Sequence, residues 1–190
     1  MSAVLEFPQR HAVSVAEYLR MGEAGVFQPE ARLELIEGEI LEMAPIGSRH
    51  SGTVNTLNRL FAQLLGERCV VAVQNPVALG DRSMPQPDLA LLKSRGDDYT
   101  RSHPTASDVL LLIEVADTTR AFDVGTKVPL YARHGIAEVW VVDLTDRTVR
   151  VFRDPGPAGY ATEISAVGED ILHALAFPEI AIQLAKLFPH

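Results

Sequence analysis

The chain has 190 residues, of which 47% are hydrophobic and 22% are charged. This length is sufficient for one well-buried core and short for two independent domains, so we expect a single domain over residues 1–190. The formal net charge of -8 argues against a protein that coats nucleic acid by bulk electrostatic attraction. It leaves room for a local basic rim that contacts phosphates.

Targeting and redox features are sparse. The longest apolar run, residues 109–115, is far shorter than the roughly 20 residues that a membrane-spanning helix needs. Residues 1–10 lack the basic start, apolar stretch and cleavage site of a signal peptide. Cys69 is the only cysteine, which excludes an intramolecular disulfide and a cysteine-rich zinc site. We therefore expect a cytoplasmic protein with no membrane partner.

The N-terminal part predicts a helix followed by a β-hairpin. Ser14 opens a helical pattern, with Glu17 in the position that completes a capping box. Residues 33–36 and 39–43 are two short strand-like runs. Gly38 lies between them and can supply the positive φ of a tight turn, so these runs should pair as a hairpin.

The middle of the chain alternates helical and extended patterns. Residues 50–65 place apolar side chains at helical spacing, which predicts an amphipathic helix. Extended segments are expected at residues 69–73 and 76–79, and further strands at 87–92 and 109–115. The last of these has no polar alternation, so both of its faces should be buried.

The C-terminal part predicts one more helix and several strands. A helix is expected over residues 123–134, with a late start or a kink because Pro129 lacks a backbone donor. Strands are expected at residues 138–143 and 148–152, then a closing strand and a short helix at 180–187. Strands that alternate with helices imply an α/β (α+β) fold, with a mixed β-sheet flanked by helices.

Two carboxylates lie inside apolar, strand-like runs. Asp88 begins the run Asp-Leu-Ala-Leu-Leu, and Glu114 lies in Leu-Leu-Leu-Ile-Glu-Val-Ala. Burial of an unpaired charge costs several kcal/mol, so something must compensate these acids. A divalent cation shared by both would do so, and oxygen ligands suit Mg²⁺ or Mn²⁺. Lys127, at the opening of the next helix, could then orient water, stabilise negative charge or act as a base.

Simpler explanations exist for the same residues. A single buried carboxylate can be satisfied by an arginine, a helix N-terminus or backbone donors. Four cations bracket the Asp88 strand and could form a phosphate-binding rim, or could be ordinary solvated charges: Arg82, Lys93, Arg95 and Arg101.

The ordered motifs resemble the putative restriction endonuclease family of the PD-(D/E)XK nuclease superfamily. The similarity covers about residues 14–155. It comprises Glu34-Leu35-Ile36-Glu37-Gly38-Glu39-Ile40, then His50, Pro87-Asp88, Glu114-Val115-Ala116, Lys127 with Tyr131, and Glu138-Val139-Trp140-Val141-Val142-Asp143. One position departs from the superfamily pattern, because Ala116 stands where a lysine is expected two residues after the glutamate. The family resembled carries its lysine on the following helix, at the position of Lys127.

The resemblance implies a restriction endonuclease-like core and a role for each matched residue. Asp88 and Glu114 would bind the metal, and Lys127 would activate water or stabilise charge. Glu34 and His50 would approach the same site, although an exposed strand residue and a structural histidine are the alternatives. Tyr131 shares the helical face of Lys127, and a core aromatic is the simpler interpretation.

These inferences lead to three functional hypotheses. The first is a metal-dependent endonuclease that hydrolyses DNA phosphodiester bonds, with two copies as a possible homodimer because a duplex has two strands to cut. The second is a nuclease-fold protein without activity that binds nucleic acid or a protein partner, which Ala116 and the acidic composition keep open. The third is hydrolysis of another phosphate ester, since a fold and a metal do not fix the substrate.

Overall fold

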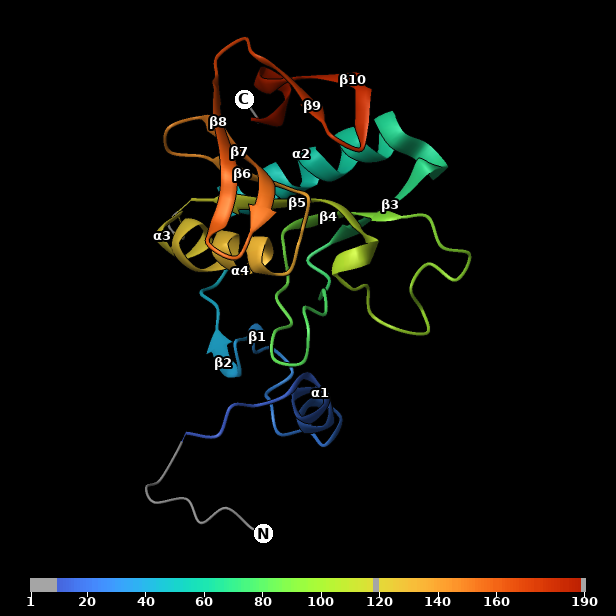
Figure 1. The fold of residues 1–190 in the computed structure, drawn as a ribbon, viewed down its shortest axis with the longest axis vertical. Helices are drawn as coiled ribbons and strands as arrows, with labels where there is room; N and C mark the ends of the chain where they lie inside the picture. The colour runs from blue at the N-terminus through green and yellow to red at the C-terminus, as the bar shows by residue number, and fades with distance from the viewer. Residues whose placement is uncertain (1–9, 118–119, 189–190) are drawn as a thin grey trace.

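The computed structural model describes residues 10–117 and 120–188, and its centre is one six-stranded sheet (Figure 1). The strands lie in the order β3-β4-β5-β6-β7-β8. Strands β5 and β6 are parallel, and the other neighbouring pairs of this sheet are antiparallel. The mixed sheet confirms the predicted fold class. Its strands are β3 (Cys69–Val73), β4 (Leu89–Lys93), β5 (Val109–Ala116), β6 (Glu138–Asp143), β7 (Thr148–Gly156) and β8 (Gly159–Val167).

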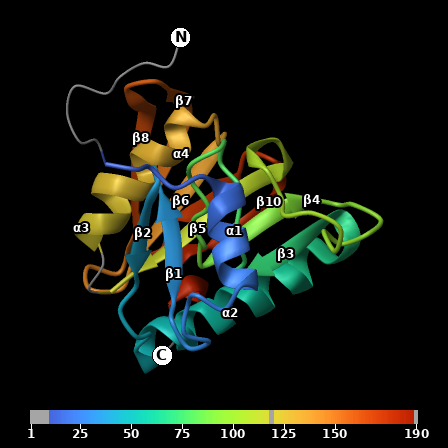
Figure 2. The same ribbon diagram turned by 90° about the horizontal axis from the view of Figure 1, so that it is seen from below.

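Helices and a second hairpin cover the two faces of the sheet (Figures 1 and 2). One face carries α2 (Ser48–Leu65) and the C-terminal hairpin, which is formed by β9 (Ile171–Ala174) and β10 (Phe177–Gln183). The other face carries α3 (Arg120–Phe122) and α4 (Val128–Arg133). The chain passes through α3 and α4 between β5 and β6, as a parallel strand pair requires a crossover.

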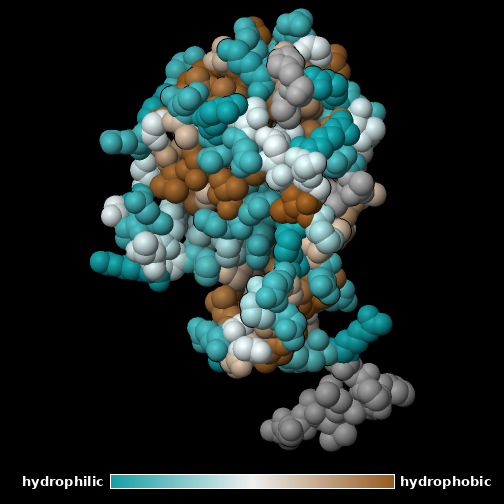
Figure 3. Space-filling view, turned by 180° about the vertical axis from the view of Figure 1, so that it is seen from behind, coloured by the Kyte–Doolittle hydropathy of each residue, from teal (hydrophilic) through white to brown (hydrophobic). Residues whose placement is uncertain are grey.

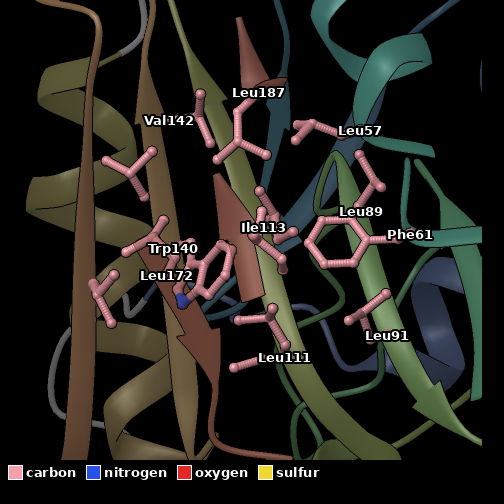
Figure 4. Packing of buried hydrophobic residues seen from close by; sticks show 14 of the residues in the cluster. Leu57, Phe61, Leu89, Leu91, Leu111, Ile113, Trp140, Val142, Leu172 and Leu187 are labelled. Atoms are coloured by element: carbon pink, nitrogen blue, oxygen red, sulfur yellow. The ribbon is translucent and has the colours of Figure 1, made fainter. Parts of the chain in front are cut away.

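The larger apolar core lies between the sheet, α2 and the C-terminal hairpin (Figure 4). Trp140 of β6 packs against Phe61 of α2, with ring centroids 6.1 Å apart. Leu172 of β9 belongs to the same cluster. All of β6 and nearly all of β5 are buried, which explains why these strands are apolar without alternation.

The N-terminal helix and hairpin form as predicted. In α1 (Val15–Glu23), the Ser14 side chain accepts a hydrogen bond from the Glu17 amide, and the Glu17 carboxylate accepts one from the Ser14 amide. The hairpin pairs β1 (Leu33–Ile36) with β2 (Glu39–Glu42). Its turn residues Glu37 and Gly38 have φ values of 50° and 86°, the signs that a two-residue type I′ turn needs. These elements lie below the sheet in Figure 1.

Two segments differ from the sequence-based expectations. The crossover helix begins at Arg120 and contains a π-helical turn, η3 (Asp123–Lys127), with Pro129 in the first turn of α4. The predicted helix at residues 180–187 is wrong, because β10 extends through Gln183 and only a 3-10 turn, η4 (Leu184–Leu187), follows. Pairing with β9 supplies the backbone hydrogen bonds of this segment. The C-terminal part also has three strands, β8 to β10, where one was expected.

No helix among residues 10–117 and 120–188 is long and apolar enough to cross a membrane. The prediction that the chain has no signal peptide concerns residues 1–10, of which only Arg10 lies within the described part. Viewed from behind, the surface is mostly hydrophilic with separate hydrophobic areas (Figure 3).

Candidate active site

The two anomalous carboxylates lie at the same end of two neighbouring strands. Asp88 directly precedes β4, and the first residue of β4, Leu89, pairs with Ile113 of β5. Glu114 follows Ile113 and faces α4, because its neighbours on the same face, Leu112 and Ala116, belong to the apolar cluster on that side. The register therefore brings Asp88 level with Glu114.

All five residues singled out from the sequence line one pocket of about 240 Å³: Glu34, His50, Asp88, Glu114 and Lys127. They come from five different parts of the chain, namely β1, the first turn of α2, the residue before β4, β5 and η3. The sheet, its two covering layers and the N-terminal hairpin thus assemble the candidate site.

Asp88 is held by three donors. Its Oδ2 accepts hydrogen bonds from the Val115 amide at 2.8 Å and is 3.0 Å from His50 Nε2, and its Oδ1 accepts one from Gln74 Nε2 at 3.1 Å. Burial alone would raise the pKa of Asp88, but the hydrogen bond and charge of His50, together with the other donors, outweigh it and lower the pKa below its ordinary value. Asp88 is therefore a carboxylate at neutral pH.

Lys127 lies between two other buried acids. Its Nζ is 3.1 Å from Glu34 Oε1 and 3.4 Å from Glu114 Oε1. Burial by itself lowers the pKa of Lys127, but the attraction of Glu114, Glu34 and Asp123 outweighs it and raises the pKa above its ordinary value. Lys127 is therefore a cation, and this direction argues against the role of a base that the sequence left open.

At Glu34 and Glu114, the two acids beside Lys127, burial determines the direction of the pKa shift. It raises the pKa of Glu34 and, well above the ordinary value, that of Glu114, although Lys127 acts in the other direction on both. Glu34 Oε2 is buried and has no hydrogen-bond partner among the described residues. One ammonium group thus compensates these two carboxylates incompletely.

The π-helical turn explains how a lysine on a helix reaches the strands. Ala116 is fully buried and cannot supply a cation. The turn η3 buries both Asp123 and Lys127 and directs both into the pocket. π-helical turns are frequent at functional sites.

Sequence reasoning missed three polar groups at the site. Asp123 lines the pocket, and Gln74 contacts Asp88. Tyr131 is a fully buried aromatic residue, as expected, but its hydroxyl also donates a hydrogen bond to Glu114 Oε1 at 2.5 Å. Its place in the matched motif and its spacing of four residues from Lys127 both pointed toward the site, but neither indicated the contact with Glu114.

The four cations suggested as a rim do not line the pocket. Lys93 lies at the far end of β4 from Asp88, and Arg95 is engaged with Asp97 and the ring of Tyr99. Arg82 lines a different pocket. The cation that does line the site pocket in their place is Arg32. The sequence pattern did not indicate that Arg32, rather than any of the four suggested cations, would line the pocket, because the position of a charged side chain in a loop depends on tertiary structure.

The first turn of α2 also borders the pocket. Gly47, its N-cap, and His50 both line the cavity, and no side chain caps this helix end. Burial alone would lower the pKa of His50, but the Asp88 carboxylate outweighs it and raises the pKa. The buried Nδ1 of His50 has no hydrogen-bond partner among the described residues. The backbone amides of a first helical turn favour anions.

The side chains that line the pocket can be compared with the ligands that a divalent metal ion requires. Within the described residues, no group of three or more His, Cys, Asp or Glu side chains is arranged to hold an ion. Mg²⁺, however, is commonly bound by one or two carboxylates and keeps several waters. Four carboxylates are buried at this pocket, from Glu34, Asp88, Glu114 and Asp123, against the cation Lys127 and the histidine His50. Arg32 also lines the pocket, so the fit to a metal rests on the neighbouring carboxylates of Asp88 and Glu114 and on the unpartnered Glu34 Oε2, which suit a cation bound by two carboxylates and water.

Comparisons with known proteins place the chain in a family. Residues 15–185 match the Uma2 family, described as putative restriction endonucleases. The fold is similar to the crystal structure of a putative nuclease belonging to DUF820 from Anabaena variabilis ATCC 29413, with a TM-score of 0.70 and 16% sequence identity over 93% of this chain and 97% of that chain. No curated protein matched the sequence. Since the match spans most of its length, the chain belongs to the Uma2 putative restriction endonuclease family.

Proposed function

We propose that the protein is a metal-dependent nuclease that hydrolyses phosphodiester bonds of DNA in the pocket between β1, α2, β4, β5 and η3. The observation that carries the proposal is the position of the buried Lys127 ammonium, which lies 3.4 Å from Glu114 Oε1 and 3.1 Å from Glu34 Oε1. The Asp88 carboxylate, just before the neighbouring strand β4, lies level with Glu114. Family membership and fold support a nuclease-like activity.

Asp88 and Glu114 are the proposed ligands of Mg²⁺ or Mn²⁺. They come from adjacent strands, and both line the pocket. Such an ion supplies an activated water and neutralises charge on the scissile phosphate. The Val115 amide, His50 and Gln74 keep Asp88 ionised and hold its orientation.

Lys127 is proposed to stabilise negative charge that develops on the phosphate. Its ammonium stays protonated beside two carboxylates, so it acts as a fixed positive charge. Glu34 holds Lys127 in place through its Oε1. His50 contacts Asp88 through Nε2 and so helps to orient this proposed metal ligand.

The phosphate is proposed to enter along the N-terminus of α2. Arg32 lines the pocket there and donates to the Ala44 carbonyl at 2.7 Å, and Arg49 lies in the first turn of the helix. Arg49 is paired with Asp117 of the pocket lining at 3.4 Å, so the positive charge proposed to attract DNA is that of Arg32, in a protein whose net charge is -8. This local positive charge offsets the repulsion between DNA and an acidic surface over short distances.

The test is cleavage of supercoiled plasmid and single-stranded DNA with Mg²⁺ or Mn²⁺. Wild type should cut, whereas Asp88→Asn and Lys127→Met should lose at least about 100-fold in rate, the usual cost of removing a group that stabilises the transition state. Lys186→Met, which removes an exposed lysine in η4, is the matched control and should cut like wild type. Equal cutting by all variants would reject the proposed site.

A second candidate is a family member that binds DNA without cutting it, which the buried Ala116 and the acidic surface favour. Gel-shift measurement on the same DNA separates the two. Binding by wild type without cleavage under every metal condition would support the second candidate. Cleavage of bis(p-nitrophenyl) phosphate without any action on DNA would instead indicate another phosphate ester as substrate.

A further inference from the structure

We infer that Tyr131 is a positioning residue, whose hydroxyl fixes the orientation of the Glu114 carboxylate at the proposed metal site. The inference rests on the proposed function, because it assigns a role to Tyr131 through a proposed metal ligand. It goes beyond the sequence-based interpretation of this residue as a core aromatic.

The hydrogen bond between Tyr131 and Glu114 is short and buried. The Tyr131 hydroxyl donates to Glu114 Oε1 at 2.5 Å, and the two side chains are 0% and 2% exposed. Distances of about 2.5–2.7 Å are typical of an O–H donor on a charged oxygen, and such bonds are roughly twice as strong as neutral ones.

The surroundings of Glu114 make this donor important. Oε1 of Glu114 has two partners, the Tyr131 hydroxyl and the Lys127 ammonium. Lys127 is closer to Glu34, at 3.1 Å, than to Glu114, at 3.4 Å, so it is shared between two acids. Without the hydroxyl, Glu114 would depend on a shared cation alone, and its side chain would be free to turn toward that cation.

Packing of the Tyr131 ring in the apolar core does not by itself require a hydroxyl group that contacts Glu114. Phenylalanine would fill almost the same volume in the apolar cluster that surrounds Tyr131. The chain also contains a half-buried tyrosine whose hydroxyl has a structural partner, since Tyr160 donates to the Ile136 carbonyl at 2.7 Å. Tyr160 packs against the cluster to which Tyr131 belongs. Tyr160→Phe is therefore a control that removes a hydrogen-bonded tyrosine hydroxyl away from the site.

The experiment measures Mn²⁺ binding to the full chain by electron paramagnetic resonance of the free ion. Partners that orient a metal ligand typically contribute 10–100-fold to metal affinity, so Tyr131→Phe should weaken Mn²⁺ binding by about that factor. Tyr160→Phe should bind like wild type. Asp88→Asn should abolish binding at the site, which identifies the signal as the proposed one.

The outcomes separate the two proposals. If wild type binds Mn²⁺, Asp88→Asn does not, and Tyr131→Phe binds as tightly as wild type, the role of Tyr131 is refuted and the metal site stands. If wild type binds no Mn²⁺, or Asp88→Asn binds it equally well, the metal site fails and the positioning role fails with it. Weakened binding by Tyr131→Phe but not by Tyr160→Phe supports both.

A second measurement covers the case in which Tyr131→Phe does not fold. Wild-type protein carrying 3-fluorotyrosine in place of Tyr131 keeps the hydroxyl and the shape of the ring. Its fluorine resonance should move when Mg²⁺ is added, while the same label in place of Tyr160 should not respond. No movement at position 131, with Mg²⁺ binding shown by competition against Mn²⁺, would overturn the inference.

Discussion

Gln74 combines a strained backbone with a contact to the proposed metal site. Its φ is 51°, in the left-handed region that costs a residue with a side chain roughly 1–2 kcal/mol. Its amide donates to the Asp88 carbonyl at 3.1 Å, and its side chain donates to Asp88 Oδ1 at 3.1 Å. Both bonds fix the residue before β4 against the end of β3. Strain of this kind is often found where a side chain must be held in place.

Replacing Gln74 should therefore separate stability from activity. Gln74→Ala and Gln74→Gly both remove the donor to Asp88, and we expect DNA cleavage with Mg²⁺ to fall about 10–100-fold in each. Glycine accepts the positive φ, so Gln74→Gly should be more stable than Gln74→Ala by about 1 kcal/mol in urea unfolding. Wild-type cleavage by either variant would show that the contact to Asp88 has no role in the activity.

Two of the site residues that the sequence indicated, Asp88 and Glu114, have chemistry that conflicts with their surroundings, whereas Glu34 and His50 were indicated by the resemblance to the family. Asp88 and Glu114 are acids in apolar runs, so their burial could be inferred locally. Gln74 and Asp123 lie at the ends of elements, where polar residues are common, and nothing local distinguishes them. The partner of the Tyr131 hydroxyl depends on how α4 packs against β5, which no short pattern encodes.

At the scale of elements, Glu138 of β6 anchors the C-terminal hairpin to the sheet. The residue is 0% exposed. Its Oε1 accepts hydrogen bonds from Trp140 Nε1 at 3.0 Å and Arg153 Nε at 2.8 Å, and its Oε2 accepts one from the Leu175 amide at 2.7 Å. Leu175 lies in the turn between β9 and β10. A single carboxylate thus joins two strands, β6 and β7, and the turn between β9 and β10.

Loss of this anchor should be costly. Glu138→Ala removes the acceptor of Trp140 and of the Leu175 amide and the carboxylate that pairs with Arg153, which keeps only the His173 carbonyl. We expect a loss of about 3–5 kcal/mol in the free energy of unfolding, measured by urea denaturation. Glu163→Ala is the control, because Glu163 is half-exposed and pairs with Arg150 at the surface, where such pairs contribute at most about 1 kcal/mol. Similar losses in the two variants would show that Glu138 is not an anchor.

The elements could be predicted where one pattern dominates. The α2 helix and the strands β5 and β6 have long apolar patterns and were found near their observed bounds. The π-helical turn was not foreseen, since it depends on how Asp123 and Lys127 are buried against the sheet, although Pro129 indicated an irregularity. The helix expected at residues 180–187 failed because its apolar spacing also fits β10, and pairing with β9 decided the outcome.

At the scale of the whole molecule, the C-terminal segment completes the core. The motif resemblance ends near residue 155, whereas the family match runs to residue 185. Beyond β8, the chain adds seven side chains to the larger apolar cluster that are at most 7% exposed: Leu172, Ala174, Phe177, Ile182, Leu184, Leu187 and Phe188. Deletion of these residues would leave one face of the sheet open to water.

A chain that stops after Val167 should therefore fail to fold. We expect loss of the near-ultraviolet circular dichroism of Trp140, together with aggregation. Leu187→Ala in the full chain should lose about 2–5 kcal/mol in urea unfolding, as for other buried leucines. Leu175→Ala, at a half-exposed position of the same hairpin, should change stability little. A well-folded shortened chain would show that the core forms without this segment.

Divalent metal should stabilise the whole fold if the buried acids bind it. A ligand present at 100 times its dissociation constant adds about 2.7 kcal/mol to the free energy of unfolding, which raises Tm by about 5–10 °C for a chain of this size. Added salt also screens the net charge of -8, so NaCl at matched ionic strength is the required control. Mg²⁺ or Mn²⁺ should raise the Tm of wild type above that control, EDTA should reverse the shift, and Asp88→Asn should abolish it. An equal shift in Asp88→Asn would mean that the ion binds away from the pocket, since only the site carboxylate differs between the two proteins.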